Sequence, residues 1–256
     1  QSRRHQPCGR GGGRTGGRLG LPFTWLGMAT VSGIRLGKGH SRQWIQRHVK
    51  DRYVQRAQED IYRSRAAYKL KQLDTEFSFL KPRSTVIDLG CFAGGWSQVA
   101  VARTGSSGGR SAAMVIGVDL VQMEPLDNHH FVLGDIRDPT TLRKVCDILG
   151  ARRANVVLSD MAPKMTGIRH DDHMASVDLC RSAAGFAGSV LQEGGWFVTK
   201  IFAGAFADKF RTELGTRFAK VRIAKPKASR PESRELYYVC SQFLGDTPPP
   251  VSVPSE

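Results

Sequence analysis

The sequence predicts an α/β fold in which a doubly wound sheet of seven mostly parallel strands is covered by helices on both faces. Short apolar runs rich in Val and Ile recur from residue 84 onward, and stretches with helical periodicity separate most of them. Near-continuous apolar strands that alternate with helices are typical of a parallel sheet buried on both faces. The chain has 256 residues, of which 40% are hydrophobic, so it can bury the core of one such domain and carry an extension.

The strands follow one another at crossover distances. Five are predicted at residues 84–90, 113–120, 131–135, 155–160 and 195–202. In the gaps, residues 140–149 and 174–192 have the apolar spacing of helices. The last two apolar runs, residues 220–226 and 235–243, have no helical pattern between them. Strands joined without a crossover helix pair antiparallel, so the last strand is predicted to run against the sheet.

Charged residues close the predicted strands, at the edge where such sheets bind ligands. They are Asp88, Asp119, Asp135, Asp160 and Lys200. The first strand leads into DLGCFAGGWSQ, whose glycines allow a tight turn and a close approach to a ligand. Asp119 is placed to accept hydrogen bonds from ribose hydroxyls, and Asp135 from an adenine amino group. Because this loop lacks the GxGxxG spacing and a phosphate cradle, S-adenosylmethionine is the expected ligand, not NAD or ATP.

Over residues 41–243 the chain resembles the FtsJ/RrmJ family of ribose 2′-O-methyltransferases. The matching stretches, in the family's order and spacing, are RHVKDRYVQRAQ, YRSRAAYKL, VIDLGCFAGGWSQVA, GVDL, GDIRD, LSDMAPKMTG, FVTKIF and KPKASRPESRELYYV. The resemblance implies a Rossmann-like methyltransferase domain over residues 41–244, and a cofactor site made of Ala93, Gly94, Gly95, Trp96, Asp119, Asp135, Ile136 and Asp160. Two positions depart from the family pattern, since Ala93 stands where Pro is usual and Lys164 where Asn is usual.

The resemblance also implies a catalytic set, which is Lys69, Asp160, Lys200 and Glu235. A ribose 2′-hydroxyl is a poor nucleophile at neutral pH, whereas a sulfonium methyl is already activated, so the enzyme must align the hydroxyl and ease its proton away. Lys200 is assigned that step, with Lys69 as an assisting cation that also contacts RNA. Asp160 and Glu235 would hold the two ammonium groups in place. Without the motif, Lys69 would be read as one of two cations on a solvated helix face, four residues after Arg65.

Positive charge is concentrated at the N-terminus. Residues 1–50 contain eight Arg, two Lys and no acidic residue, which is +10 of the formal +15. An Arg-rich, acid-free start predicts a mitochondrial transit segment over residues 1–40 and a location in the matrix. As an alternative, GRGGGRTGGRLG is typical of a disordered RNA-binding tail. The Pro-rich residues 245–256 are predicted to be a disordered tail.

Residues 51–256 indicate an RNA partner. They include 28 basic and 23 acidic residues, and this excess of positive charge suits a surface that contacts phosphate. RHVKDRYVQRAQEDIYRSR resembles the large-subunit rRNA branch of the family, which with the transit-like start implies methylation of a uridine in mitochondrial large-subunit rRNA, presented in a ribosomal precursor. The alternatives are a tRNA ribose 2′-O-methyltransferase and a non-catalytic ribosome-assembly factor.

Two further classes of site are not expected. No apolar run approaches the ~20 residues that span a bilayer. The five cysteines are scattered without the spacing of a zinc site or a disulfide frame, so neither a membrane span nor a metal is predicted.

Overall fold

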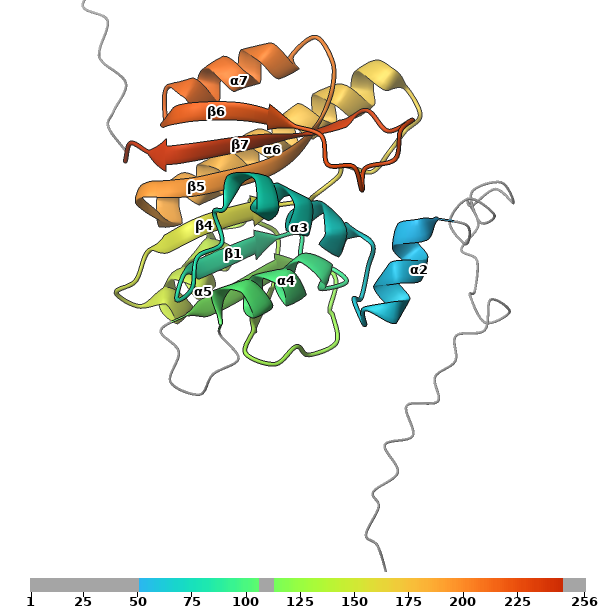
Figure 1. Cartoon of the computed structure of the whole chain (residues 1–256). Coiled ribbons are helices and arrows are strands. Elements are labelled where there is room, and N and C mark those ends of the chain that lie inside the picture. Colours follow the sequence, from blue (N-terminus) through green and yellow to red (C-terminus); the bar gives the residue numbers. More distant parts are fainter. Residues whose placement is uncertain (1–50, 106–112, 246–256) are drawn as a thin grey trace, which may run out of the picture. The chain divides into compact units, whose positions relative to one another are not determined.

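The computed structural model describes residues 51–105 and 113–245, which form a sandwich around one seven-stranded sheet (Figure 1). The strand order across the sheet is β3-β2-β1-β4-β5-β7-β6. The strands are β1 (Thr85–Leu89), β2 (Met114–Asp119), β3 (His130–Leu133), β4 (Ala154–Ser159), β5 (Leu191–Phe202), β6 (Phe218–Ala224) and β7 (Glu235–Phe243). The helices are α2 (Arg52–Glu59), α3 (Ala66–Phe77), α4 (Gly95–Thr104), α5 (Pro139–Leu149), α6 (Arg169–Val190) and α7 (Ala207–Gly215).

Strand directions confirm the predicted fold class. Parallel pairing joins β3, β2, β1, β4 and β5, whereas β7 runs antiparallel to both of its neighbours, β5 and β6. The chain moves outward from β1 to β3 and then crosses back to place β4 on the other side of β1. Ligands of open α/β sheets bind at such a switch point, beyond the carboxyl ends of the strands.

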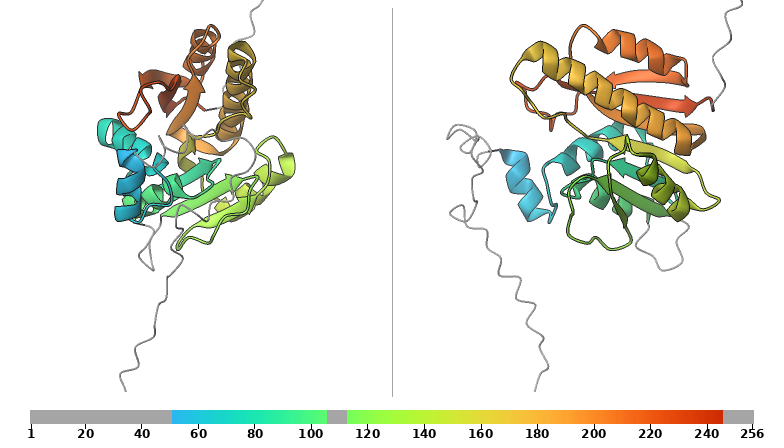
Figure 2. Two further views of the ribbon diagram at one scale, coloured as in Figure 1. Left: turned by 90° about the vertical axis from the view of Figure 1, so that its right-hand side faces the viewer. Right: turned by 180° about the vertical axis from the view of Figure 1, so that it is seen from behind.

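Helices cover both faces of the sheet (Figure 2), and alternate residues of the central strands pack into opposite helical layers. Ile87 and Ile116 pack with residues of α5, α6 and α7, whereas Val86 and Val115 pack with residues of α3 and α4. Fully burying each such side chain contributes about 1.5–3 kcal/mol. Burial on both faces explains why these strands are nearly continuous apolar runs. Because helices cover both faces, most of the charged residues that close the strands lie at the edge formed by the strand ends.

The long helix predicted over residues 174–192 differs from the structure at both ends. α6 spans Arg169–Val190, and β5 begins directly at Leu191. Asp172 lies in the first turn of α6, where its carboxylate accepts hydrogen bonds from the backbone N–H groups of Thr166 (2.6 Å) and Gly167 (3.1 Å). An acidic first turn also suits the positive end of the helix dipole. The polar residues at the start of α6 are helical, although they lie outside the apolar pattern that predicted the helix.

A small buried cluster ties α2 and α3 to the loop between β6 and β7. Its members are Tyr53, Ala57, Tyr68 and Ala228. Asp51 caps α2 by accepting a hydrogen bond from the Tyr53 N–H at 3.0 Å, and its carboxylate also pairs with Arg65 and, at 3.6 Å, with Arg230. The segment that leads into β7 is therefore held against α3.

The predicted transit segment, residues 1–40, and the predicted C-terminal tail apart from Gly245 lie outside the described residues. In the part of the chain that the structure describes, no helix is long and apolar enough to cross a membrane.

Candidate active site

The four residues of the predicted catalytic set come from elements that meet at the carboxyl edge of β4 and β5. Lys69 lies on α3, Asp160 follows β4, Lys200 lies on β5 and Glu235 opens β7. In the antiparallel pair of β5 and β7, Lys200 stands opposite Tyr237, and Phe202 opposite Glu235. Because side chains alternate along a strand, Glu235, Tyr237 and Lys200 point to the same face of the sheet.

Two nearly buried ion pairs form there. The Lys200 Nζ lies 3.1 Å from Asp160 Oδ1 and donates a hydrogen bond to the Asp160 carbonyl oxygen at 2.6 Å. The Lys69 Nζ lies 2.7 Å from Glu235 Oε1. Each of the four side chains is only 11–15% exposed, so removing one partner would leave a poorly solvated charge. The structure thus brings all four residues together, with the two ammonium groups held by the two carboxylates.

Tyr237 connects the two ion pairs. Its hydroxyl donates a hydrogen bond to Asp160 Oδ1 at 2.7 Å, and the Lys69 Nζ lies 5.9 Å from the centre of its ring. From the sequence, Tyr237 is recognisable only as part of the predicted strand at residues 235–243. Its position two residues after Glu235, on the same face of one strand, is the signal that identifies it.

The surrounding charges keep Asp160 ionised. Burial alone would raise the pKa of Asp160, but Lys200, then Lys69, and the hydrogen bond from Tyr237 together hold it below its usual range. Burial raises the pKa of Tyr237 well above its ordinary value, and the charges of Asp160 and Glu235 raise it further. Tyr237 therefore stays a hydrogen-bond donor, and Asp160 stays a carboxylate that can orient a cation.

Asp88 is an exception among the charged strand ends. It is fully buried within β1, where Oδ2 accepts a hydrogen bond from the Ser97 hydroxyl at 2.7 Å. Its Oδ1 has no hydrogen-bond partner in the described part of the chain. Burial raises the pKa of Asp88 to about 7, with smaller increases from Asp160 and Asp119 against the lowering effect of the Ser97 hydrogen bond. Asp88 lies inside the protein, so it does not face a ligand as the strand-end pattern suggested.

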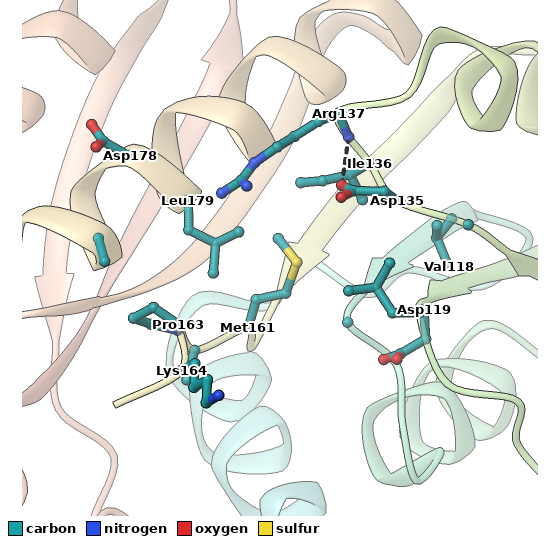
Figure 3. Close-up of a pocket in the computed structure, with 15 residues that line it drawn as sticks. Val118, Asp119, Asp135, Ile136, Arg137, Met161, Pro163, Lys164, Asp178 and Leu179 are labelled. Atoms are coloured by element: carbon teal, nitrogen blue, oxygen red, sulfur yellow. Dashed lines mark hydrogen bonds between the residues drawn. The ribbon is translucent and has the colours of Figure 1, made fainter. Parts of the chain in front are cut away.

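A cavity of about 590 Å³ opens next to the ion pairs, beyond the ends of β1, β2, β3 and β4 (Figure 3). It is lined by Gly90, Val118, Asp119, Leu120, Gly134, Asp135, Ile136, Arg137, Met161, Ala162, Pro163, Lys164, Ala175, Asp178 and Leu179. Figure 3 shows Asp119 and Asp135 on one side of this space, with Pro163 and Leu179 on the other. Met161 directly follows Asp160, so the cavity adjoins the ion pairs, and its volume suits a small-molecule ligand.

Asp119 and Asp135 are held in fixed orientations. Asp119 accepts hydrogen bonds from the N–H groups of Phe92 (2.8 Å) and Val121 (2.9 Å). Asp135 Oδ1 accepts one from the Arg137 N–H at 2.9 Å. A carboxylate oxygen can accept more than one hydrogen bond, so both residues keep the capacity to accept from hydroxyl or amino groups. With the apolar walls of the cavity, they fit the adenosine part of the expected cofactor.

The predicted glycine-turn residues do not line this cavity. They are Ala93, Gly94, Gly95 and Trp96. Gly94 has φ +101°, and a Cβ there would lie 3.0 Å from the Arg63 side chain, while a Cβ on Gly95 would lie 2.3 Å from the Ser64 Oγ. Trp96 is buried and donates its ring N–H to the Ala66 carbonyl at 2.9 Å. Close packing against residues 63–66 explains these residue types, and their contact with a cofactor stays a prediction.

Two cations of the cavity complete the site. Arg137 and Lys164 both line it, and only Lys164 was singled out by the sequence, as a departure from the family pattern.

Among residues 51–105 and 113–245, no three His, Cys, Asp or Glu side chains are grouped in a way that could hold a metal ion.

Comparisons with known proteins agree with this geometry. A family model described as FtsJ-like methyltransferase matches residues 62–243. The ribosomal RNA large subunit methyltransferase E of Brucella ovis is 40% identical over 236 residues, covering 92% of this chain and 97% of the relative. The protein of that name from Mesorhizobium japonicum is 44% identical over 219 residues, covering 86% and 82%. A crystal structure described as a ribosomal RNA methyltransferase from Plasmodium falciparum has a TM-score of 0.65 and 35% identity, covering 72% of this chain and 100% of the other. The chain therefore belongs to the FtsJ-like methyltransferase family.

Proposed function

We propose that this protein transfers the methyl group of S-adenosylmethionine to the 2′-hydroxyl of a uridine ribose in mitochondrial large-subunit rRNA. The observation that carries the chemistry is the Lys200 ammonium group, fixed by two contacts to Asp160 beside a cavity that fits adenosine. The names of the Brucella and Mesorhizobium relatives support large-subunit rRNA as the substrate. Those relatives are bacterial, so the mitochondrial location rests on the acid-free residues 1–50, and uridine rests on the family resemblance.

The cofactor, when bound, supplies a methyl group already activated by the positive charge on its sulfur. The protein therefore has to bind the adenosine part and to present the acceptor oxygen in line with the methyl carbon. Asp119 would accept from the ribose hydroxyls and Asp135 from the adenine amino group, because both carboxylates face the cavity. Arg137 and Lys164 balance these acidic groups at the same cavity.

Lys200 would act on the acceptor hydroxyl. An ammonium group has three N–H donors. Two of them are directed at the Asp160 carbonyl and carboxylate oxygens, which leaves one for the ribose 2′-oxygen. In this form Lys200 orients the oxygen so that a lone pair faces the methyl carbon. After losing a proton, the same nitrogen can accept the hydroxyl proton as the new C–O bond forms.

Lys69 would serve the RNA side of the site. Glu235 occupies one of its three donors at 2.7 Å, and the remaining donors can reach oxygens of the substrate. Arg65, four residues before Lys69 at the start of α3, and Arg230, in the segment before β7, both pair with Asp51 and add positive charge on the segments that carry Lys69 and Glu235. A phosphate-contacting role for these cations follows from the affinity of Arg and Lys for the RNA backbone.

The proposal is tested by replacing Lys200 with Ala and measuring tritiated methyl transfer to large-subunit rRNA precursors. We expect the transfer rate to fall about 100-fold or more, with the dissociation constant for S-adenosylmethionine nearly unchanged, because Lys200 contacts the acceptor. Lys200→Arg should not restore the rate, because a guanidinium stays protonated and is planar. Lys220→Ala, an exposed lysine of the edge strand β6, is the matched control and should keep the wild-type rate.

Three results would each contradict a different part of the proposal. Near wild-type transfer by Lys200→Ala would remove Lys200 from the chemistry. A wild-type protein that binds cofactor and rRNA precursor without ever transferring a methyl group would be an assembly factor. Methylation of tRNA in preference to rRNA would overturn the substrate assignment and leave the reaction intact.

A further inference from the structure

Around Cys91, beside the cofactor cavity, the structure brings together a thiol, a thioether and an imidazole, on the face of β2 where residue 117 is Gly and has no side chain. The Cys91 Sγ contacts the Met123 Sδ at 3.7 Å. A Cβ on Gly117 would lie 2.7 Å from the Cys91 Sγ and 2.5 Å from the His129 Nε2, so these two atoms border the same small space. Cys91 and Met123 are 3% and 5% exposed.

The His129 Nε2 is the least satisfied atom of this group. It is buried and has no hydrogen-bond partner in the described part of the chain. A buried ring nitrogen without a hydrogen-bond partner has lost its contact with water and gained nothing in return. A neutral imidazole nitrogen is a good metal ligand.

We propose that Cys91, Met123 and His129 form a binding site for a single soft monovalent metal ion, Cu(I). A thiolate, a thioether and an imidazole are the ligand types that select Cu(I) among the first-row metals. With metal–sulfur distances of about 2.3 Å, two sulfurs 3.7 Å apart subtend an angle of about 107° at the ion, which is near tetrahedral. The two sulfur atoms are thus already at a bridging distance.

The charge balance also suits this ion. Binding exchanges one proton for one Cu(I), because the S–H bond of Cys91 breaks as the S–Cu bond forms and the proton passes to solvent. The net charge of this buried region therefore stays the same. The carboxyl groups of Asp88 and Asp119, which act electrostatically on the Cys91 thiol, would attract the cation, whereas Arg63, which acts on His129, would oppose it.

A bound ion would join two segments that position the cofactor site. Cys91 belongs to the turn after β1, and Met123 and His129 belong to the segment between β2 and β3. The N–H groups of Phe92 and Val121, one from each segment, hold the Asp119 carboxylate. The site would therefore fix the two backbone donors of a predicted cofactor ligand.

The test is titration of the full-length protein with Cu(I) in competition with bathocuproine disulfonate, without oxygen and without S-adenosylmethionine. All variants carry Cys8→Ser and Cys146→Ser, so that the N-terminal cysteine and the exposed thiol of α5 cannot bind the metal. We expect one ion per chain and a thermal midpoint that rises with Cu(I). We also expect an affinity that increases about tenfold per pH unit between pH 6 and 8, because one proton is released. X-ray absorption should show two sulfur ligands and one nitrogen ligand.

Three substitutions and one control decide the outcome. Cys91→Ala, Met123→Leu and His129→Leu should each weaken Cu(I) binding at least tenfold, while Cys240→Ala, which removes a buried thiol from β7, should leave it unchanged. Met123→Leu preserves packing, so its effect is separable from misfolding, which the metal-free thermal midpoint reports. Undiminished binding in Cys91→Ala or Met123→Leu, a sulfur-free ligand shell, or an affinity independent of pH would each overturn the proposal.

Discussion

Tyr237→Phe is the most informative single change at the site, because it deletes one hydrogen bond and keeps the packing. The hydroxyl donates to Asp160 Oδ1 at 2.7 Å, while the ring packs 5.9 Å from the Trp96 ring and beside the Lys69 ammonium group. Phenylalanine retains that ring. The variant therefore tests whether the carboxylate that holds Lys200 needs a second anchor.

The size of the effect follows from the contacts that remain. A hydrogen bond to a charged group contributes about 1.5–3 kcal/mol, which corresponds to about 10- to 150-fold in rate. Lys200 stays within 3.1 Å of the same Oδ1 and keeps its bond to the Asp160 carbonyl, so Asp160 is not left unpaired. We therefore expect the lower end, about a tenfold fall in kcat, with cofactor affinity unchanged.

The pH profile supplies a second readout. The hydrogen bond from Tyr237 is one of the interactions that hold the pKa of Asp160 low, so the variant should raise that pKa. Protonated Asp160 loses its attraction for the Lys200 ammonium group, and the acid limb of the kcat/KM profile should move toward neutral pH.

Methyl transfer by Tyr237→Phe is measured from pH 5 to 9 beside Tyr238→Phe. Tyr238 is an equally buried neighbour whose hydroxyl donates to the Ala207 carbonyl at 2.8 Å, away from the ion pairs. The control should lose stability comparably and keep both kcat and the acid limb. If Tyr237→Phe matches this control in rate and pH profile, Asp160 is positioned by Lys200 alone and the reasoning fails.

Three other outcomes are expected. Asp119→Ala should weaken S-adenosylmethionine binding about 5- to 150-fold by calorimetry, since about 1–3 kcal/mol is lost when hydroxyl partners are left unpaired, and unchanged affinity would exclude Asp119 from the site. For Asp88, the folded pKa of about 7 lies above the ordinary value of 3.8, so the contribution of Asp88 to the free energy of unfolding is complete below about pH 4 and is lost as pH rises through 7. Asp88→Asn should remove this decline of about 4 kcal/mol from urea unfolding curves between pH 4 and 8, and an unaltered decline would locate the titration elsewhere. Residues 1–50 fused to a fluorescent protein should enter mitochondria, whereas a nucleolar signal would favour the RNA-binding-tail interpretation.

Most of the fold was predictable because burial on both faces leaves a direct record in the sequence. β1, for example, is five buried residues long and opens with three β-branched residues in succession, residues 85–87. The antiparallel last strand followed from the missing helical pattern before Glu235. The helix boundaries were less predictable, because α6 starts with polar residues. One of them, Asp172, accepts hydrogen bonds from backbone N–H groups of the preceding loop.

Some residues of the site were predictable from the sequence and others were not. The structure pairs Lys200 with Asp160 and Lys69 with Glu235, and the roles of these residues in methyl transfer stay a prediction. Tyr237 was missed because a buried tyrosine in a strand is ordinarily part of the core, and its hydroxyl partner comes from 77 positions away along the chain. Asp88 was misjudged because a carboxylate near the end of a strand can point into the protein. The sequence does not show whether such a side chain faces the core or a ligand.

The antiparallel strand is what makes the chemical edge of this sheet complete. Parallel strands deliver their last residues to the ligand edge, as β4 does with Asp160. A parallel strand beside β5 would likewise bring its final residue, not its first, to the level of Lys200. Because β7 runs the other way, its first residue, Glu235, pairs with Phe202, two positions beyond Lys200, and Tyr237 stands directly opposite Lys200. One reversed strand therefore supplies both the carboxylate that holds Lys69 and the hydroxyl that holds Asp160. In a circular permutant that opens the chain within the β6–β7 loop, the Glu235–Phe202 pair would become the frayed end of the ladder while the pairs from Leu236 onward persist. Methyl transfer should therefore be lost at a lower urea concentration than the circular dichroism signal of the fold.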